Sequence, residues 1–145
     1  MKSKKTLIMI GGGIQEFDAV MKLQKVGFKV AVVDKDPKCK CFKLADYKIN
    51  CDATDIKSIV SWILLNRKRI RISGVFTLIN QAFTVAAVSD ICGLVSIKPD
   101  KVLRFDNKIF IKNFFKKKNF LTPHFKVIEN LIQLKHFIKN NKSYY

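Results

Sequence analysis

Three consecutive glycines, Gly11–Gly13, stand between an apolar run and an amphipathic segment. Backbone amides at such a turn, together with the positive end of the helix that follows, can cradle an anion. The dinucleotide-binding fingerprint needs glycine at relative positions one, three and six, and the sixth position here is Glu16. A carboxylate at that place would crowd and repel a pyrophosphate. The spacing therefore favours another anionic or polar ligand over a dinucleotide, with a purely structural turn as the alternative.

A second group of polar residues follows the predicted strands. Asp34 closes an apolar run, at the place where a ribose-binding acid would stand, and Asp36-Pro37 extends this acidic turn. Asn80 and Gln81 follow a later apolar run. Ligands of open α/β sheets bind outside the carboxyl ends of the strands, so these side chains are candidates for orienting a substrate. The alternatives are a turn stabilised by Asp side chains and ordinary surface polarity.

Other chemistries find little support in the chain. Cys39 and Cys41 are one residue apart, too close for the usual metal-knuckle spacing, and the other two cysteines stand alone. Neither histidine has a nucleophile or carboxylate partner visible in the sequence, and no Ser-His-Asp order or Walker-type phosphate loop occurs. We therefore predict no catalytic residue, no metal site and four reduced thiols.

The net charge of +17 raises the question of nucleic-acid binding. Phosphate and base recognition favours the arginine fork, yet few of the 28 basic residues are arginine. The arginines are Arg67, Arg69, Arg71 and Arg104. The lysines are scattered, with one dense run at 116–118. We interpret the charge as a solvated lysine-rich surface, and a basic nucleic-acid-binding protein as a disfavoured alternative.

Apolar runs and helical periodicities alternate over the first hundred residues, which predicts a Rossmann-like, doubly wound α/β sheet with at least four parallel strands. Strands are expected at 6–10, 28–33, 46–50 and 75–79, and helices at 14–26, from Thr54 or Asp55 to about Arg69, and at 81–91. The alternation of apolar runs and helical periodicities ends at Pro99. Helices are expected at 100–105, at 107–118 and from a cap at Asn130 to about Lys139, with a strand at 125–128.

This change predicts two parts, a sheet domain at 1–98 and a helical and strand appendage at 99–145. The 145 residues suit one domain of ordinary size with a small appendage. No apolar run is long enough to span a bilayer, and the basic start lacks a signal-peptide cleavage site. We therefore expect a cytoplasmic protein without a membrane partner.

An ordered set of segments resembles the N-terminal, pre-ATP-grasp region of ATP-grasp ligases, such as the carbamoyl-phosphate synthase large chain, biotin carboxylase and the purine-pathway carboxylate ligases. The resemblance runs from about Lys5 to Tyr145. Asn107 stands where an Asp is common in the family. The segments are Gly11–Gln15, Gly27–Pro37, Leu44–Ile49, Asp52–Asp55, Asn107–Lys108 and Phe120–Pro123.

The resemblance implies a chemistry and a set of residues. Such enzymes use ATP and Mg²⁺ to convert a small carboxylate into an acyl phosphate, which an amine or ammonia then attacks. Lys108 matches the lysine that reaches a nucleotide phosphate. With Asp34 from the strand-end argument, the substrate-binding set comprises Gly11, Gly12, Gly13, Ile14, Gln15, Asp34, Asn80 and Gln81.

The resemblance also implies what lies beyond this sequence. Tyr144-Tyr145 falls where the family begins the strand that leads into its ATP-grasp core. We therefore expect an N-terminal fragment that lacks catalysis, binds no cofactor tightly, pairs as a homodimer and has the missing ATP-grasp domain as its partner. The alternative from a different class is a stand-alone Rossmann-type module that binds a nucleotide or dinucleotide.

Overall fold

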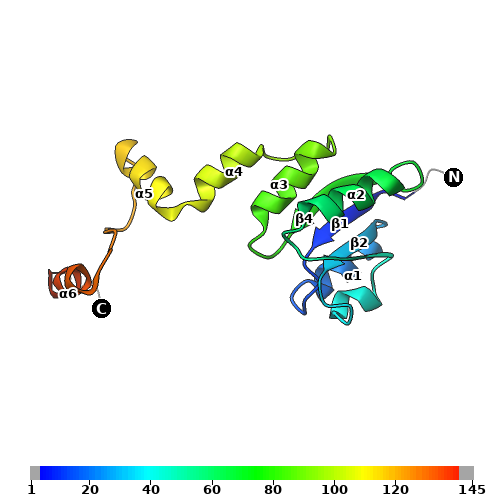
Figure 1. Cartoon of the computed structure of the whole chain (residues 1–145), viewed down its shortest axis with the longest axis horizontal. Helices are drawn as coiled ribbons and strands as arrows, with labels where there is room; N and C mark the ends of the chain where they lie inside the picture. Colours follow the sequence, from blue (N-terminus) through cyan, green and yellow to red (C-terminus); the bar gives the residue numbers. More distant parts are fainter. Residues whose placement is uncertain (1–3, 141–145) are drawn as a thin grey trace. The chain divides into compact units, whose positions relative to one another are not determined.

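The computed structural model describes residues 4–140, and the interpretation of Tyr144-Tyr145 falls outside this range. Four strands form one sheet in the order β3-β2-β1-β4, and every neighbouring pair is parallel (Figure 1). The predicted fold class is confirmed. The strands are β1 (Thr6–Ile10), β2 (Lys29–Asp34), β3 (Tyr47–Asn50) and β4 (Ile72–Thr77).

The helices follow the predicted periodicities. Asp55, rather than Thr54, caps α2 by accepting a hydrogen bond from the N–H of Ser58, and Asn107 caps α5 in the same way. The Asn130 side chain likewise accepts from the N–H of Gln133 at the start of α6. The elements are α1 (Phe17–Lys25), the 3₁₀ helix η1 (Lys40–Lys43), α2 (Ile56–Asn66), α3 (Ala82–Ile91), α4 (Pro99–Asp106), α5 (Lys108–Lys117) and α6 (Leu131–Asn140).

Helices cover both faces of the sheet because successive strand residues point to opposite sides. Alternate residues of β1 and β2 therefore enter two separate hydrophobic clusters. The first packs against α2 and α3 and contains Ile8, Ile10, Ala31, Val33, Ile59 and Val88 among its members. The second packs against α1 and η1 and contains Met9, Val20, Val30, Val32, Cys41 and Phe42 among its members. The two clusters make the sheet doubly wound.

One strand begins three residues earlier and ends two residues earlier than predicted. β4 begins at Ile72 and ends at Thr77, whereas the apolar run predicted 75–79. Gly74, taken for a turn residue, lies inside the strand opposite Leu7 of β1, and a side chain added to it would come within 3.3 Å of Leu7 Cδ2. The register shifts beside it, so Ser73 is an extra residue that donates from Oγ to the carbonyl of Thr6.

The predicted strand at 125–128 is wrong, because the described residues of this segment adopt no regular structure. A strand needs a neighbour to accept its backbone hydrogen bonds, and the strands of the described sheet all lie between residues 6 and 77. The chain divides into two compact units, Met1–Leu103 and Arg104–Tyr145. No residue of α5 or α6 in the second unit is buried. Among residues 4–140, no helix is both long and apolar enough to cross a membrane.

Candidate functional site

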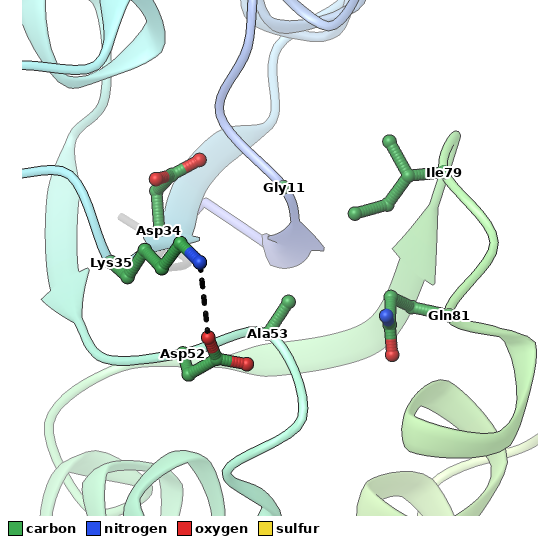
Figure 2. Close-up of a pocket in the computed structure, with 7 residues that line it drawn as sticks. All are labelled: Gly11, Asp34, Lys35, Asp52, Ala53, Ile79 and Gln81. Atoms are coloured by element: carbon green, nitrogen blue, oxygen red, sulfur yellow. Dashed lines mark ion pairs between the residues drawn. The ribbon is translucent and has the colours of Figure 1, made fainter.

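A pocket of about 260 Å³ opens at the carboxyl edge of the sheet. Segments that follow all four strands contribute to it, and β1 lies between β2 and β4, where the strand order reverses. This is the place where open α/β sheets bind ligands. In Figure 2, Lys35 and Asp52 face each other on one side, and Ile79 and Gln81 lie on the other. The lining residues are Gly11, Asp34, Lys35, Asp52, Ala53, Ile79 and Gln81.

The glycine loop after β1 lies against its surroundings too closely for side chains. A Cβ on Gly12 would stand 2.8 Å from Cys39 Sγ and 3.0 Å from Val32 Cγ1. Gly11 has a φ of +99°, and a Cβ there would stand 3.1 Å from Ile79 Cδ1. Both positions therefore require glycine, one for close approach and the other also for its backbone conformation.

Asp34 fastens this loop to the end of β2. Its Oδ2 accepts a hydrogen bond of 2.8 Å from the N–H of Gly12, and its Oδ1 accepts one of 2.9 Å from the N–H of Asp36. The Asn50 side chain in turn donates to the carbonyl oxygens of Asp34 and Lys35. Both carboxylate oxygens of Asp34 thus accept hydrogen bonds from the backbone, which gives this side chain a positioning role. Fewer of its lone pairs remain to accept a hydrogen bond from a ribose hydroxyl.

Lys35 and Asp52 form the charged side of the pocket. Their charged atoms are 3.7 Å apart, and both side chains are largely exposed. The backbone N–H and the hydroxyl of Thr54 donate to Asp52 Oδ1 at 2.9 and 2.7 Å, and these hydrogen bonds, the backbone one first, hold the pKa of Asp52 below its ordinary value. Asp52 is therefore ionised at neutral pH. Lys35 is the cationic member of the lining set and can exchange this partner for a ligand carboxylate.

The opposite side of the pocket is neutral and polar. Gln81 Oε1 accepts a hydrogen bond of 3.0 Å from the hydroxyl of Thr84, which is buried. This contact orients the amide and leaves its N–H groups for a ligand. Thr77 donates from Oγ1 to the carbonyl of Ile10 at 2.8 Å and so joins the ends of β4 and β1.

The predicted substrate residues divide between two hollows and the surface. Gly11, Asp34 and Gln81 line the pocket. A second, wider hollow of about 530 Å³ shares Asp34 and is lined also by Gly12, Gly13 and Ile14, together with Lys38 and Lys40. The exposed residues Gln15 and Asn80 line neither hollow. Lys108 is the first residue of α5, is exposed, and belongs to the second compact unit of the chain.

Four lining residues were missed. Lys35 and Asp52 follow β2 and β3, so the rule that selected Asp34 would have selected them as well. Ala53 is apolar and carried no signal. The sequence pattern places Ile79 at the last position of a strand, because the predicted strand ends two residues later than β4.

Glu16 lies buried beside the loop, and only 2% of its surface is exposed. Its Oε1 has no hydrogen-bond partner among the described residues, and its Oε2 would lie 2.9 Å from a Cβ on Gly13. Glu16 stands where the dinucleotide fingerprint has its third glycine, so the loop does not match that fingerprint. Among the described residues, no group of three His, Cys, Asp or Glu side chains is arranged to hold a metal ion. The pocket residues alone therefore supply no preformed metal cluster within the described part of the chain.

No protein-family model and no curated protein matches this sequence. Solved structures do match. Phosphoribosylglycinamide synthetase from Anaerococcus prevotii superposes with a TM-score of 0.69 at 22% identity, over 96% of this chain and 35% of that one. An N5-carboxyaminoimidazole ribonucleotide synthetase in complex with ADP gives 0.72 at 20% identity, over 97% and 36%. The L-amino acid ligase from Bacillus licheniformis gives 0.68 at 11% identity, over 98% and 43%.

These likenesses identify the fold. The chain has the fold of the pre-ATP-grasp domain, the N-terminal third of ATP-grasp enzymes. It spans about a third of the length of the first structures that it matches.

Proposed function

We propose that this chain is the substrate-side domain of an ATP-dependent ligase that activates a small carboxylate as an acyl phosphate and joins it to an amine or ammonia. The observation that carries the proposal is the pocket at the carboxyl edge, built on a glycine loop in a fold shared with two synthetases and an amino acid ligase. One of these synthetases was solved with ADP.

The geometry supports a role for each pocket residue. The Gly11–Gln15 loop contacts the substrate through Gly11, the Asn80–Gln81 segment does so through Gln81, and Asp34 holds the loop against β2. Lys35 binds the substrate carboxylate, because its ammonium faces the pocket and its present partner lies at 3.7 Å, beyond hydrogen-bond distance. The Gln81 amide donates to a second oxygen of the substrate.

ATP and Mg²⁺ belong, in this proposal, to an ATP-grasp core that acts together with these residues. Lys108 contributes a cation to a nucleotide phosphate in that assembly. The isolated 145-residue chain does not hydrolyse ATP, because the nucleotide clamp and the metal must be preorganised together. Metal-dependent ATP turnover by the isolated chain would contradict this part of the proposal.

The pocket assignment has its own test, which is calorimetric titration of the chain with small mono- and dicarboxylates. We expect a weak saturable signal that the substitution Lys35→Gln abolishes. The matched control is Lys98→Gln, which removes the same charge from a lysine that pairs with Asp90 away from the pocket. Equal losses in both variants, or no signal from any carboxylate, would refute the role of Lys35. Saturable binding of NAD(H) or AMP would instead favour the stand-alone nucleotide module.

A further inference from the structure

The edge of the sheet opposite the pocket collects cations. Because all four strands are parallel, residues that precede a strand meet at this amino edge. Lys4 and Lys5 precede β1, and the segment 67–71 precedes β4. The N–H of Thr6 donates to the carbonyl of Arg71 at 2.7 Å, and the N–H of Lys29 donates to the carbonyl of Lys5 at 2.9 Å. These bonds place the starts of β2, β1 and β4 side by side.

A tight turn between α2 and β4 fixes the backbone that carries several of these cations. The N–H groups of Arg69 and Ile70 both donate to the carbonyl of Asn66, at 2.9 and 2.8 Å, and close a tight turn. Ile70 is buried, whereas the residues on both sides of it are exposed. An inward apolar anchor thus fixes the turn and directs the neighbouring cations outward. We call the exposed set the basic edge, which consists of Lys4, Lys5, Arg67, Lys68, Arg69 and Arg71.

Nothing in the described part of the chain neutralises the basic edge. The ion pairs within residues 4–140 are Lys35–Asp52 and Lys98–Asp90, and neither includes a residue of this edge. Asp46, which precedes β3 at the same edge, is engaged elsewhere. Its Oδ2 accepts from the N–H of Val30 at 3.0 Å and from the side chain of Gln24 at 2.9 Å.

The arginines argue for a specific ligand rather than for general solvation. Arg104 is the only arginine of the chain that lies outside the segment 67–71, so this edge holds three of the four. Lysine is the common cation of the chain, whereas the planar arginine fork binds phosphate oxygens in pairs.

We propose that the basic edge binds the phosphate backbone of a nucleic acid, as a second site of the chain that is separate from the pocket. The arginine fork matches the phosphodiester oxygens that every nucleic acid presents along its backbone. Most of the other lysines serve as solvated surface.

The test measures anisotropy of a fluorescein-labelled oligouridine with the 145-residue chain, from about 50 to 200 mM salt. We compare the triple variant Arg67→Gln, Arg69→Gln, Arg71→Gln with the matched control Lys116→Gln, Lys117→Gln, Lys118→Gln, which loses the same charge from the densest lysine run. Each lost phosphate contact lowers the salt slope by about 0.7, so the arginine variant loses about 2 in slope and at least about tenfold in affinity. The lysine variant stays within about threefold of the parent.

The outcomes decide the proposal. Equal losses in the two triple variants would show a general charge effect and overturn it, as would the absence of binding at low salt. Vesicles of phosphatidylcholine and phosphatidylserine form a second arm, and arginine-dependent vesicle binding stronger than RNA binding would assign the edge to membranes instead. A triple variant with lysine at the same three positions keeps the charge. Weaker RNA binding by this variant would show that the guanidinium geometry, and not only the charge, contributes to affinity. Melting curves followed by circular dichroism verify that every variant is folded.

Discussion

The two edges of the sheet differ in how their charged side chains are partnered. At the carboxyl edge, Asp34 and Asp52 follow strands and accept hydrogen bonds from neighbouring backbone N–H groups. At the amino edge, Arg69 and Arg71 precede a strand and have no acidic partner among the described residues. In a parallel sheet, a position before or after a strand decides which edge a side chain joins. The net charge of +17 therefore conceals a division between a polar pocket and a basic surface.

The largest expected effect comes from disrupting the closest contact at the carboxyl edge. In Gly12→Val, the new side chain would collide with Cys39 Sγ, which lies 2.8 Å from a Cβ at that position, and with Val32. Overpacking of this kind lowers the free energy of unfolding by about 3 kcal/mol. Urea denaturation measures the loss, and carboxylate binding should disappear with it. The exposed Asn80→Ala is the control, and a Gly12→Val variant of parental stability would contradict the close packing of the loop.

The next effect tests the anchor of the amino edge. Ile70→Ala removes a buried side chain that holds the turn before β4, and it should cost about 2 kcal/mol of unfolding free energy. The exposed neighbour Arg69→Gln should cost about 0.5 kcal/mol or less, because a surface change without a partner alters stability little. Chemical denaturation of the pair separates the two roles. Equal costs would mean that the buried isoleucine stabilises the turn no more than its exposed neighbour, which would contradict its role as the anchor.

Where the sequence predicted the structure well, local signals and tertiary packing agree. The apolar runs of β1 and β2 are long and β-branched, and Asp55 and Asn107 carry side chains that cap helices unaided. β4 was misplaced because a glycine inside a strand resembles a turn until the neighbouring Leu7 is known. The segment 125–128 has the composition of a strand, yet strand formation depends on a neighbour that no local pattern supplies.

The candidate site was predicted only in part for a related reason. The glycine loop and Asp34 have recognisable spacing, and three predicted residues line the pocket. Lys35 and Asp52 face each other only because β3 lies beside β2, a neighbour relation that depends on the order of the whole sheet. The basic edge was not predicted for the same reason, because Lys4 and Lys5 join the segment 67–71 only when β1 pairs with β4.

A smaller effect tests whether the Asp34 carboxylate holds the glycine loop against β2. In Asp34→Asn, one oxygen that accepts from a backbone N–H becomes an amide nitrogen, so one of the two contacts with Gly12 and Asp36 is lost. Loss of a charge-assisted hydrogen bond should lower the unfolding free energy by about 1.5 kcal/mol. Asp36→Asn is the matched control, because it removes the same charge from an exposed residue that accepts one hydrogen bond, from Lys38. A control as damaging as Asp34→Asn would argue for a general charge effect.

The smallest effect concerns acid, and it separates the aspartates beside the pocket, which titrate in the acidic range, from the arginines of the basic edge, which do not. Hydrogen bonds from Thr54 and Ser58, respectively, hold the pKa values of Asp52 and Asp55 below the ordinary value of 3.8. A carboxylate with a lowered pKa in the folded state stabilises the fold above that ordinary value, and this contribution disappears as the pH falls through the lowered pKa. The parent should therefore exceed the variant Asp52→Asn, Asp55→Asn in melting temperature at pH 7, with the difference shrinking below pH 3.8. The arginine triple variant should keep a constant offset from the parent over the same range, because arginine stays charged throughout. A difference for the aspartate variant that grows on acidification would reverse the sign and disprove the assignment of these two carboxylates.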